Sequence, residues 1–485
     1  MLTGRCTLRL TNQSNICSSE ASARLVDKAD SRWSLLNIVR SVVGHVRTSV
    51  LKGTPMIAAA PKVLFRWLCC SMMLCTTSLL SAAEWSGWRG PHGSGLADGT
   101  GYPISWSATE NLIWSADISG LGGSTPAVAG DAIFITTTEN DENIVSCFGL
   151  DGKHRWSKTV GAAVAGKPGK DGTGANPSVT TDGELLFAYF KSGDLACFTV
   201  TGELQWQTNL QERYGEDTLW WDLGTSPVLV KNAVVIACMH SGPSYVAAFG
   251  RKDGKLLWKH DRELGAPEEA AQSYSTPIVI RENDQEVLVV LGADHVTAHS
   301  TEDGKELWRV GGLNPTGHKY FRSIASPSAA DGIVIAPYAR GNSLTAIRVG
   351  GTGDVTKSHV IWTNPATSAD VPTPVVADGR VFVCRDVDRA RGTIDCLDVT
   401  TGKSIWSGQL EEHRTTYRSS PVLADGRLYV TRQDGTVFVL DAAGPEFKVL
   451  SKNLIAEEHM VATPVFIDGK ILLRSNTRMH LIGKI

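Results

Sequence analysis

The fold is decided by a repeat whose fifth copy begins at Ser326-Pro327. Residues 326–362 read SPSAADGIVIAPYARGNSLTAIRVGGTGDVTKSHVIW. Two β-rich apolar runs, Ile333 to Tyr338 and Leu344 to Val349, are bounded by turn signals such as Asp331-Gly332 and lack helical periodicity. The dipeptide opens a first strand and the tryptophan segment supplies a last one. One copy of the repeat therefore predicts four short strands.

The Ser/Thr-Pro dipeptide returns at a nearly constant period, which is typical of solenoids and propellers. The steps between successive prolines are 51, 50, 50, 50, 47, 47 and 43 residues. A tryptophan recurs in phase with the dipeptide, and Phe447 takes the eighth place. The dipeptides are Thr125-Pro126, the variant Asn176-Pro177, Ser226-Pro227, Thr276-Pro277, Ser326-Pro327, Thr373-Pro374, Ser420-Pro421 and Thr463-Pro464. The tryptophans are Trp114, Trp156, Trp206, Trp258, Trp308, Trp362 and Trp406.

Eight such units predict an all-β fold, an eight-bladed β-propeller of four-stranded antiparallel blades. One unit cannot bury both faces of its sheet, so units must pack side by side, and ring closure leaves only short protected edges. Trp114 precedes the first Thr-Pro, whereas the segment from Thr463 to Ile485 has room for only three strands. We therefore expect Asn111 to Asp117 to close the eighth blade as an N-terminal strand.

The turn before the tryptophan carries a recurrent Thr-Gly or Asp-Gly, best seen in residues 396–406, CLDVTTGKSIW. Thr-Gly-x-x-x-Trp resembles the tryptophan-docking motif of the PQQ-like propeller repeat family, which includes quinoprotein dehydrogenases and BamB-type envelope scaffolds. The resemblance covers residues from about 111 to 485 and departs at Cys396, where the family prefers Ala. It implies that the seven tryptophans dock between blades. One fold hosts many activities, so the resemblance does not specify an activity.

The amino-terminal part lies outside the repeat. Lys62 and Arg66 precede an apolar run, Trp67 to Leu80, and then Ser81-Ala82-Ala83, the three-part form of a secretory signal. We predict residues 1–55 to be a mis-assigned or disordered extension, 56–83 a signal peptide, 84–110 a Trp-rich lead-in that packs on the propeller, and 111–485 the propeller. The run is too short to span a bilayer comfortably, so no transmembrane segment is expected in the mature chain. A lipidated Cys75 is an alternative, although Leu74 is not the small residue expected before it.

Composition limits the partners and the compartment. With 47 basic and 50 acidic side chains the chain is nearly neutral, which disfavours nucleic acid. We expect a monomer that is secreted across the inner membrane and is periplasmic or associated with the cell envelope. The cysteines beyond residue 84 are odd in number, and most lie in apparent strands, so buried unpaired thiols are expected. A Cys384–Cys396 disulfide is the alternative.

Strand alternation places the loops that enter each Ser/Thr-Pro strand on one face, with the residues just ahead of the proline nearest the axis. A ligand or partner site is therefore expected at Asp222, Tyr274, Arg322, Asp370, Arg418 and His459, with Trp220 and Trp221 as an aromatic platform or a plain loop anchor. Repeats five to eight are rich in arginine here, which suits an anionic ligand. The favoured interpretation pairs these arginines with acidic neighbours, namely Asp370, Asp386, Asp388, Asp434 and Glu457.

The signatures of catalysis are weak. The resemblance implies that a dehydrogenase has a vicinal cysteine pair over its cofactor, a tryptophan floor and Ca²⁺ ligands. The chain's Cys-Cys, Cys69-Cys70, lies in the predicted signal, and Cys-x-x-Cys-His is missing. Asp386-x-Asp388 resembles the start of a Ca²⁺ loop, but Ala390 stands where an oxygen ligand is needed. We predict no metal site and no cofactor, and no residue is predicted to be catalytic.

The sequence favours a secreted, non-catalytic propeller that serves as a binding or assembly scaffold in the cell envelope, with an envelope protein or an anionic or carbohydrate ligand at the axial face. One alternative is a quinoprotein dehydrogenase that uses PQQ and calcium to oxidise alcohols or sugars. Another is a carbohydrate-binding module that uses Trp220 and Trp221.

Overall fold

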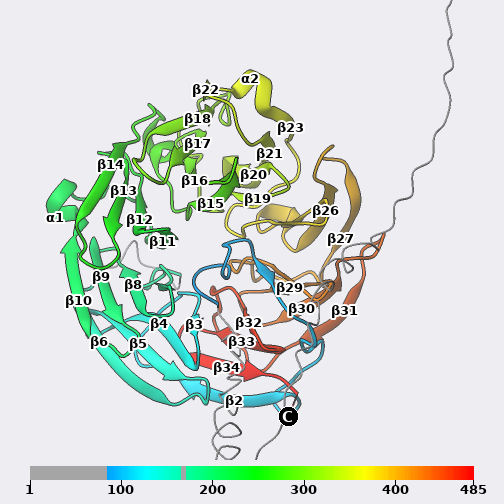
Figure 1. The fold of residues 1–485 in the computed structure, drawn as a ribbon. Helices are drawn as coiled ribbons and strands as arrows, with labels where there is room; N and C mark the ends of the chain where they lie inside the picture. The colour runs from blue at the N-terminus through cyan, green and yellow to red at the C-terminus, as the bar shows by residue number, and fades with distance from the viewer. Residues whose placement is uncertain (1–84, 165–170, 485) are drawn as a thin grey trace, which may run out of the picture. The chain divides into compact units, whose positions relative to one another are not determined.

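The computed structural model describes residues 85–164 and 171–484, which form an all-β propeller of eight antiparallel sheets around a common axis (Figure 1). The predicted extension and signal peptide lie outside the described residues. Helix is confined to short segments, namely α1 (Leu210–Tyr214), α2 (Thr356–His359) and the 3₁₀ turns Glu268–Ala271, Ala339–Gly341 and Asp388–Ala390. Within the described part of the chain, no helix is long and apolar enough to cross a bilayer.

The blades follow the chain in order, each from an inner to an outer strand. Blades 1 to 4 are β3 (Ala127–Ala129), β4 (Ala132–Glu139), β5 (Glu142–Gly149), β6 (His154–Ala162); β7 (Thr180–Thr181), β8 (Leu185–Tyr189), β9 (Asp194–Thr199), β10 (Leu204–Asn209); β11 (Val228–Val230), β12 (Ala233–Cys238), β13 (Tyr245–Gly250), β14 (Leu256–Asp261); β15 (Ile278–Glu282), β16 (Gln285–Gly292), β17 (His295–Ser300), β18 (Glu306–Val310).

Blades 5 to 8 are β19 (Ser328–Ala330), β20 (Ile333–Tyr338), β21 (Ser343–Arg348), β23 (Val360–Asn364); β24 (Val375–Ala377), β25 (Arg380–Cys384), β26 (Thr393–Asp398), β27 (Ser404–Gln409); β28 (Val422–Ala424), β29 (Arg427–Thr431), β30 (Val437–Asp441), β31 (Val449–Asn453); β32 (Val465–Ile467), β33 (Lys470–Arg474), β34 (Arg478–Ile482), β2 (Leu112–Asp117). The two-residue strands β22 (Gly353–Asp354) and β1 (Leu96–Ala97) add parallel edges to blades 4 and 7.

The eighth blade is built from both ends of the propeller. Strand β2 pairs antiparallel with β34, and Trp114 lies opposite Leu481. The register shifts between Leu112 and Trp114, as at a β-bulge. This is the pairing that the position of Trp114 predicts, and it covers an edge of the last blade that would otherwise be open.

A belt of buried hydroxyl groups explains the Ser/Thr of the repeated dipeptide. The amide of one anchor residue donates to the hydroxyl of the next, as in Thr276 N to Ser326 Oγ at 2.8 Å and Ser326 N to Thr373 Oγ1 at 2.9 Å. Thr463 N donates to Thr125 Oγ1 at 3.0 Å, so the belt also joins the last blade to the first. Each bond satisfies a buried amide and links two neighbouring blades near the axis.

The sequence analysis assigns the anchor of blade 2 to Asn176, which is two residues away from the belt position that the structure shows. Ser178, and not Asn176, takes the place of the Ser/Thr in blade 2. Thr125 N donates to Ser178 Oγ at 2.9 Å, and Ser178 N donates to Ser226 Oγ at 3.0 Å. The proline of this blade therefore precedes the hydroxyl residue. Asn176 is released from the belt and lies at the axial cavity.

Tryptophans pack across the blade boundaries. A Cβ on Gly152, Gly202, Gly254, Gly304 or Gly402 would meet the indole of Trp114, Trp156, Trp206, Trp258 or Trp362, respectively. Several indoles also donate to a carbonyl oxygen of the next blade, for example Trp206 Nε1 to Arg251 O at 2.8 Å and Trp362 Nε1 to Val399 O at 2.9 Å. Trp308 and Trp406 differ: Trp308 Nε1 donates to Glu282 Oε2 at 3.2 Å, and Trp406 packs against Phe382 and Phe447.

The lead-in passes through the middle of the ring (Figure 1). Trp85 is 1% exposed and forms an isolated β-bridge with Val128 of blade 1. Arg89 is fully buried and donates from Nη1 to Thr373 O at 3.1 Å and from Nη2 to Pro374 O at 2.8 Å. The lead-in therefore ties blade 1 to blade 6 across the axis.

The five cysteines in the described part of the chain are buried and free, namely Cys147, Cys197, Cys238, Cys384 and Cys396. The prediction of buried unpaired thiols is thus confirmed, and the alternative Cys384–Cys396 disulfide is absent among the described residues.

Candidate functional site

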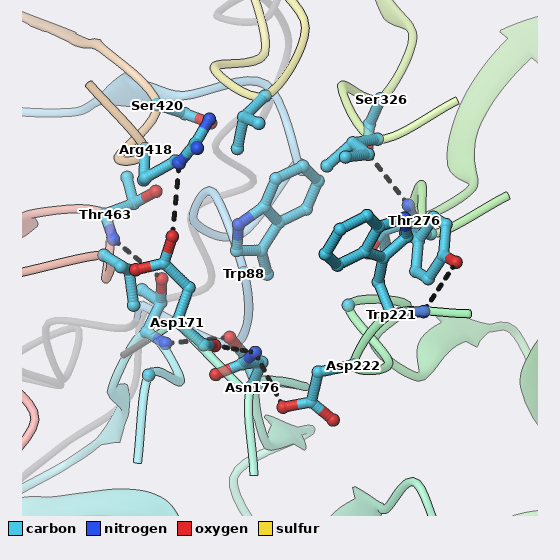
Figure 2. A pocket seen from close by; sticks show the side chains of 18 of the residues that line it. Trp88, Asp171, Asn176, Trp221, Asp222, Thr276, Ser326, Arg418, Ser420 and Thr463 are labelled. Carbon is cyan, nitrogen blue, oxygen red and sulfur yellow. Dashed lines mark hydrogen bonds and ion pairs between the residues drawn. The ribbon is translucent and has the colours of Figure 1, made fainter. Parts of the chain in front are cut away.

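A cavity of about 490 Å³ lies on the axis at the face where the anchor strands begin, called here the axial face (Figure 2). Six belt hydroxyl residues from different blades line it, namely Thr125, Ser178, Thr276, Ser326, Ser420 and Thr463. The repeat itself therefore positions this cavity, because six of the eight blades contribute the residue at the head of the inner strand to the same place.

Aromatic and aliphatic side chains form much of the cavity wall. Trp88 of the lead-in projects into the middle of the cavity, between Arg418 on one side and Trp221 on the other (Figure 2). Tyr274 and Val371 add further apolar surface. Because Arg89 is anchored among backbone carbonyl oxygens, the neighbouring Trp88 is held at a fixed depth in the ring.

Asp171 is the centre of a polar cluster at one side of the cavity. His459 Nε2 lies 2.7 Å from Asp171 Oδ1, Gln433 Nε2 donates to the same oxygen at 2.6 Å, and Arg418 Nε lies 3.3 Å from Asp171 Oδ2. Burial acts to raise the pKa of Asp171. The hydrogen bond from His459 and the charge of Arg418 outweigh that effect, so the pKa is lowered. Asp171 is thus an ionised and fully engaged carboxylate.

Arg418 also pairs with a second, buried carboxylate. Its Nη1 lies 3.3 Å from Asp386 Oδ2, and the backbone amides of Asp370 and Val371 donate to Asp386 at 2.8 and 3.2 Å. The Asp386 side chain is 0% exposed. Burial, reinforced by the charge of Asp370, raises the pKa of Asp386 to about 7. Arg418 therefore contacts two acidic groups, and the ionised Asp171 already supplies it with a counter-charge.

Asp222 lies on the cavity wall in a different environment. Its Oδ2 accepts from Gly174 N at 2.7 Å and from Asn176 Nδ2 at 3.0 Å, and its Oδ1 accepts from Leu223 N at 3.0 Å. Burial raises the pKa of Asp222 to about 6, although the backbone hydrogen bonds act to lower it. All three donors are neutral, and no ion pair to Asp222 occurs among residues 85–164 and 171–484.

Arg322 and Asp370 form a buried pair behind the cavity wall. Arg322 Nη2 lies 3.0 Å from Asp370 Oδ2, and Arg322 Nε lies 3.4 Å from Glu269 Oε1. Glu269 Oε1 also accepts from Trp221 Nε1 at 2.9 Å. Neither Arg322 nor Asp370 lines the cavity. Arg322 is linked to the Trp221 indole through Glu269.

The two exposed indoles at the rim have fixed backbones. Trp220 N donates to Gln272 Oε1 at 3.0 Å, and Trp221 N donates to Tyr274 Oη at 3.1 Å. Tyr274 Oη in turn donates to Gln272 Oε1 at 2.8 Å. Tyr274 is 4% exposed, and burial raises its pKa, so the phenol stays protonated. Gln272 and Tyr274 together set the course of the Trp220-Trp221 loop.

The structure places the predicted axis-facing residues in two groups. Asp222, Tyr274, Arg418, His459 and Trp221 line one cavity, whereas Arg322, Asp370 and Trp220 do not line it. The interpretation that the arginines pair with acidic neighbours is confirmed for Arg322 with Asp370 and for Arg418 with Asp386.

Sequence reasoning missed Asp171, Gln433 and Trp88 as lining residues. Asp171 lies five residues before Asn176 and seven before Ser178, whereas the predicted residues precede their anchors by two to four positions. A rule based on the distance to the anchor therefore does not reach Asp171. The lead-in was expected to pack on the propeller, but nothing in its sequence shows which of its indoles enters the cavity.

The charged side chains of the cavity can be compared with what PQQ would need. PQQ carries three carboxylates, and Arg418, the arginine on the described lining, already faces two. Asp171 and Asp222 border the same space and would repel such a ligand. No group of three or more His, Cys, Asp or Glu side chains is arranged to hold a metal ion in the part of the chain that the structure describes. The described residues of the cavity do not fit PQQ with calcium.

Comparison with known proteins identifies the family to which the chain belongs. A family model described as outer membrane protein assembly factor BamB matches residues 96–269, 244–443 and 390–480. Outer membrane protein assembly factor BamB of Yersinia pestis is 23% identical over 397 residues, which cover 80% of this chain and 86% of that protein.

Solved structures share the fold at low identity. BamB from Moraxella catarrhalis has a TM-score of 0.56 at 14% identity, covering 76% of this chain and 99% of that one. Quinohemoprotein alcohol dehydrogenase from Comamonas testosteroni has a TM-score of 0.60 at 11% identity, covering 84% and 82%. An assembly factor and a dehydrogenase thus share this architecture, and the likeness to solved structures shows the fold alone. Because the family model matches residues 96–480 with overlapping segments, the chain belongs to the family of the outer membrane protein assembly factor BamB.

Proposed function

We propose that the protein is a non-catalytic scaffold of the cell envelope, which acts after secretion by holding a segment of a partner protein against its axial face. The family supports this proposal, since its described relative is an assembly factor of outer membrane proteins. The observation that carries it is the pair of adjacent indoles beside the cavity, Trp220 and Trp221, which are 37% and 42% exposed.

Such a rim is suited to binding a protein segment. Aromatic side chains supply large contact area and are enriched at the centres of protein interfaces. The backbone amides of both tryptophans are held by Gln272 and Tyr274, so little conformational entropy is lost on binding. Tyr320 extends the surface, with its ring centroid 6.5 Å from that of Trp220.

Site-specific photo-crosslinking tests the proposal. We would place a photoreactive phenylalanine analogue at Tyr320, and at Leu257 as a control that is 53% exposed on the outer strand β14. In envelope fractions of the native host, the Tyr320 probe is expected to trap a defined partner, identified by mass spectrometry, that the Leu257 probe does not trap. Adding Trp220→Ala and Trp221→Ala should abolish that product. Equal trapping at both positions, or trapping that survives the double substitution, would contradict a role for the axial face.

A dehydrogenase is the second candidate. Trp88 in the axial cavity favours it, whereas the charges of the described lining argue against PQQ with calcium. Its test is incubation with PQQ and Ca²⁺ followed by dye-linked oxidation of a panel of alcohols and sugars. Turnover that is lost on Trp88→Leu would favour the dehydrogenase over the scaffold. The same panel of sugars, assayed for binding alone, tests the carbohydrate-binding alternative through the Trp220 and Trp221 variants.

A further inference from the structure

Among residues 85–164 and 171–484, the charges that border the axial cavity leave one acidic group without an ion-pair partner. Asp171 faces His459 and Arg418, and Asp386 faces Arg418. Behind the wall, Asp370 is paired with Arg322. Asp222 accepts hydrogen bonds from two backbone amides and from an asparagine amide, all neutral. Among the described residues, the cavity therefore has an unpaired carboxylate, which belongs to Asp222.

The surroundings of Asp222 suit a cation. The Trp88 indole stands in the same cavity, and the faces of aromatic rings attract ammonium and guanidinium groups. Val371 and Ile324 provide apolar surface for the methylene chain that carries such a group. An anion would meet Asp222 and Asp171, while Arg418 is already shared between two carboxylates.

We propose that the axial cavity takes up a lysine or arginine side chain of the partner segment, with Asp222 as its counter-charge and the Trp88 indole as its aromatic wall (Figure 2). This assignment rests on the proposed function, because the cation is carried by the bound segment. It adds that the segment is basic at the position that enters the cavity, whereas the anionic ligand considered in the sequence analysis would be acidic.

The burial of Asp222 also makes binding of a cation depend on pH. The pKa of Asp222 is raised to about 6, so the carboxylate is largely ionised above that pH and loses its charge below it. The other ionisable side chains on the described lining are Asp171, Arg418 and His459, and the charge of Lys191 also acts on Asp222. Binding of a cation should therefore weaken as the pH falls through 6.

The test uses three fluorescein-labelled nonapeptides of Gly and Ser that differ at the central residue: lysine, Nε-acetyllysine and glutamate. Affinities for the full mature protein are measured by fluorescence anisotropy at pH 7.5 and pH 5. We expect the lysine peptide to bind best and to lose about ten-fold in affinity with Asp222→Asn, as for a close, partly desolvated charge pair. The matched control is Asp331→Asn, which removes one carboxylate from an exposed turn where φ is 50° and Asn is well tolerated.

Several results would overturn the assignment. These are equal binding of the lysine and acetyllysine peptides, tighter binding of the glutamate peptide, or no binding of the lysine peptide up to about 1 mM. Because Asp222→Asn exchanges a hydrogen-bonded carboxylate, its thermal unfolding is recorded alongside. The wild-type comparison between pH 7.5 and pH 5 needs no variant, and an unchanged lysine-peptide affinity there would also count against Asp222. If a partner is trapped at Tyr320 but the lysine peptide does not bind, the proposed scaffold function stands and only the cation site is rejected.

Discussion

Trp114 and Gly152 join the last blade of the propeller to the first. A Cβ on Gly152 would lie 2.8 Å from Cδ2 of the Trp114 indole, and Gly152 has a φ of 79°. Trp114 Nε1 donates a hydrogen bond of 2.9 Å to the carbonyl oxygen of Leu150 in the same turn. The glycine is required twice, because a side chain would meet the ring and because the backbone is left-handed. Since Trp114 lies on β2, this contact fastens the closing strand to blade 1.

Replacement of Trp114 by alanine should therefore weaken ring closure. We expect Trp114→Ala to lower the free energy of unfolding by about 3 kcal/mol, because it removes a large packed side chain and its hydrogen bond. Ile113→Ala, on the same strand and 37% exposed, is the control and should cost less than about 1 kcal/mol. Denaturant unfolding followed by circular dichroism measures both. Similar losses in the two variants would show that the indole does not fasten the strand.

The hydroxyl belt makes a second prediction at the same boundary. Thr125→Val keeps the shape of the side chain but leaves the buried amide of Thr463 without its acceptor, which lies 3.0 Å away. A loss of about 1–3 kcal/mol in the free energy of unfolding is expected. Thr352→Val, at an exposed position, controls for the change in residue type. A stability unchanged from wild type would mean that the belt bonds are not required.

The period of the repeat was sufficient to predict the blades, because each blade repeats the same local pattern of turns and apolar runs. The closing role of residues 111–117 also followed, since the Trp anchor there precedes its own dipeptide. The register of blade 2 did not follow, because a proline at 177 outweighs Ser178 in any search for Ser/Thr-Pro. Ion pairing between distant loops, such as Asp171 with Arg418 and His459, leaves no mark in the local sequence.

A third prediction concerns Arg89, which we expect to hold the lead-in in place. It is fully buried, and burial lowers its pKa to about 9, so it remains protonated at neutral pH. Arg89→Met leaves the carbonyl oxygens of Thr373, Pro374 and Ser94 without this donor, and should destabilise the protein by about 3 kcal/mol or more. Trp88 should become more accessible to acrylamide quenching, which a mere loss of global stability would not produce under native conditions. Arg348→Met, at an exposed site on β21, serves as the control. Quenching identical to wild type would show that Arg89 does not position Trp88.

The last prediction concerns the buried carboxyl of Asp386 and the pH dependence of the free energy of unfolding. Its pKa rises from an ordinary 3.8 to about 7 on folding, chiefly because of burial. The folded state therefore binds a proton that the unfolded state lacks across this window, and stability falls as the pH rises through it.

Asp386→Asn should remove that dependence. The variant is expected to be least stable relative to wild type near pH 4 and to gain on it steadily up to about pH 7, by at most about 1.4 kcal/mol per pH unit. Asp378→Asn, in an exposed turn where φ is 51°, should track wild type at every pH. The measurement is the free energy of unfolding in urea at a series of pH values. A difference between Asp386→Asn and wild type that stays constant from pH 4 to pH 7 would mean that Asp386 stays ionised in the folded protein, with Arg418 and the amides of Asp370 and Val371 compensating fully for its burial.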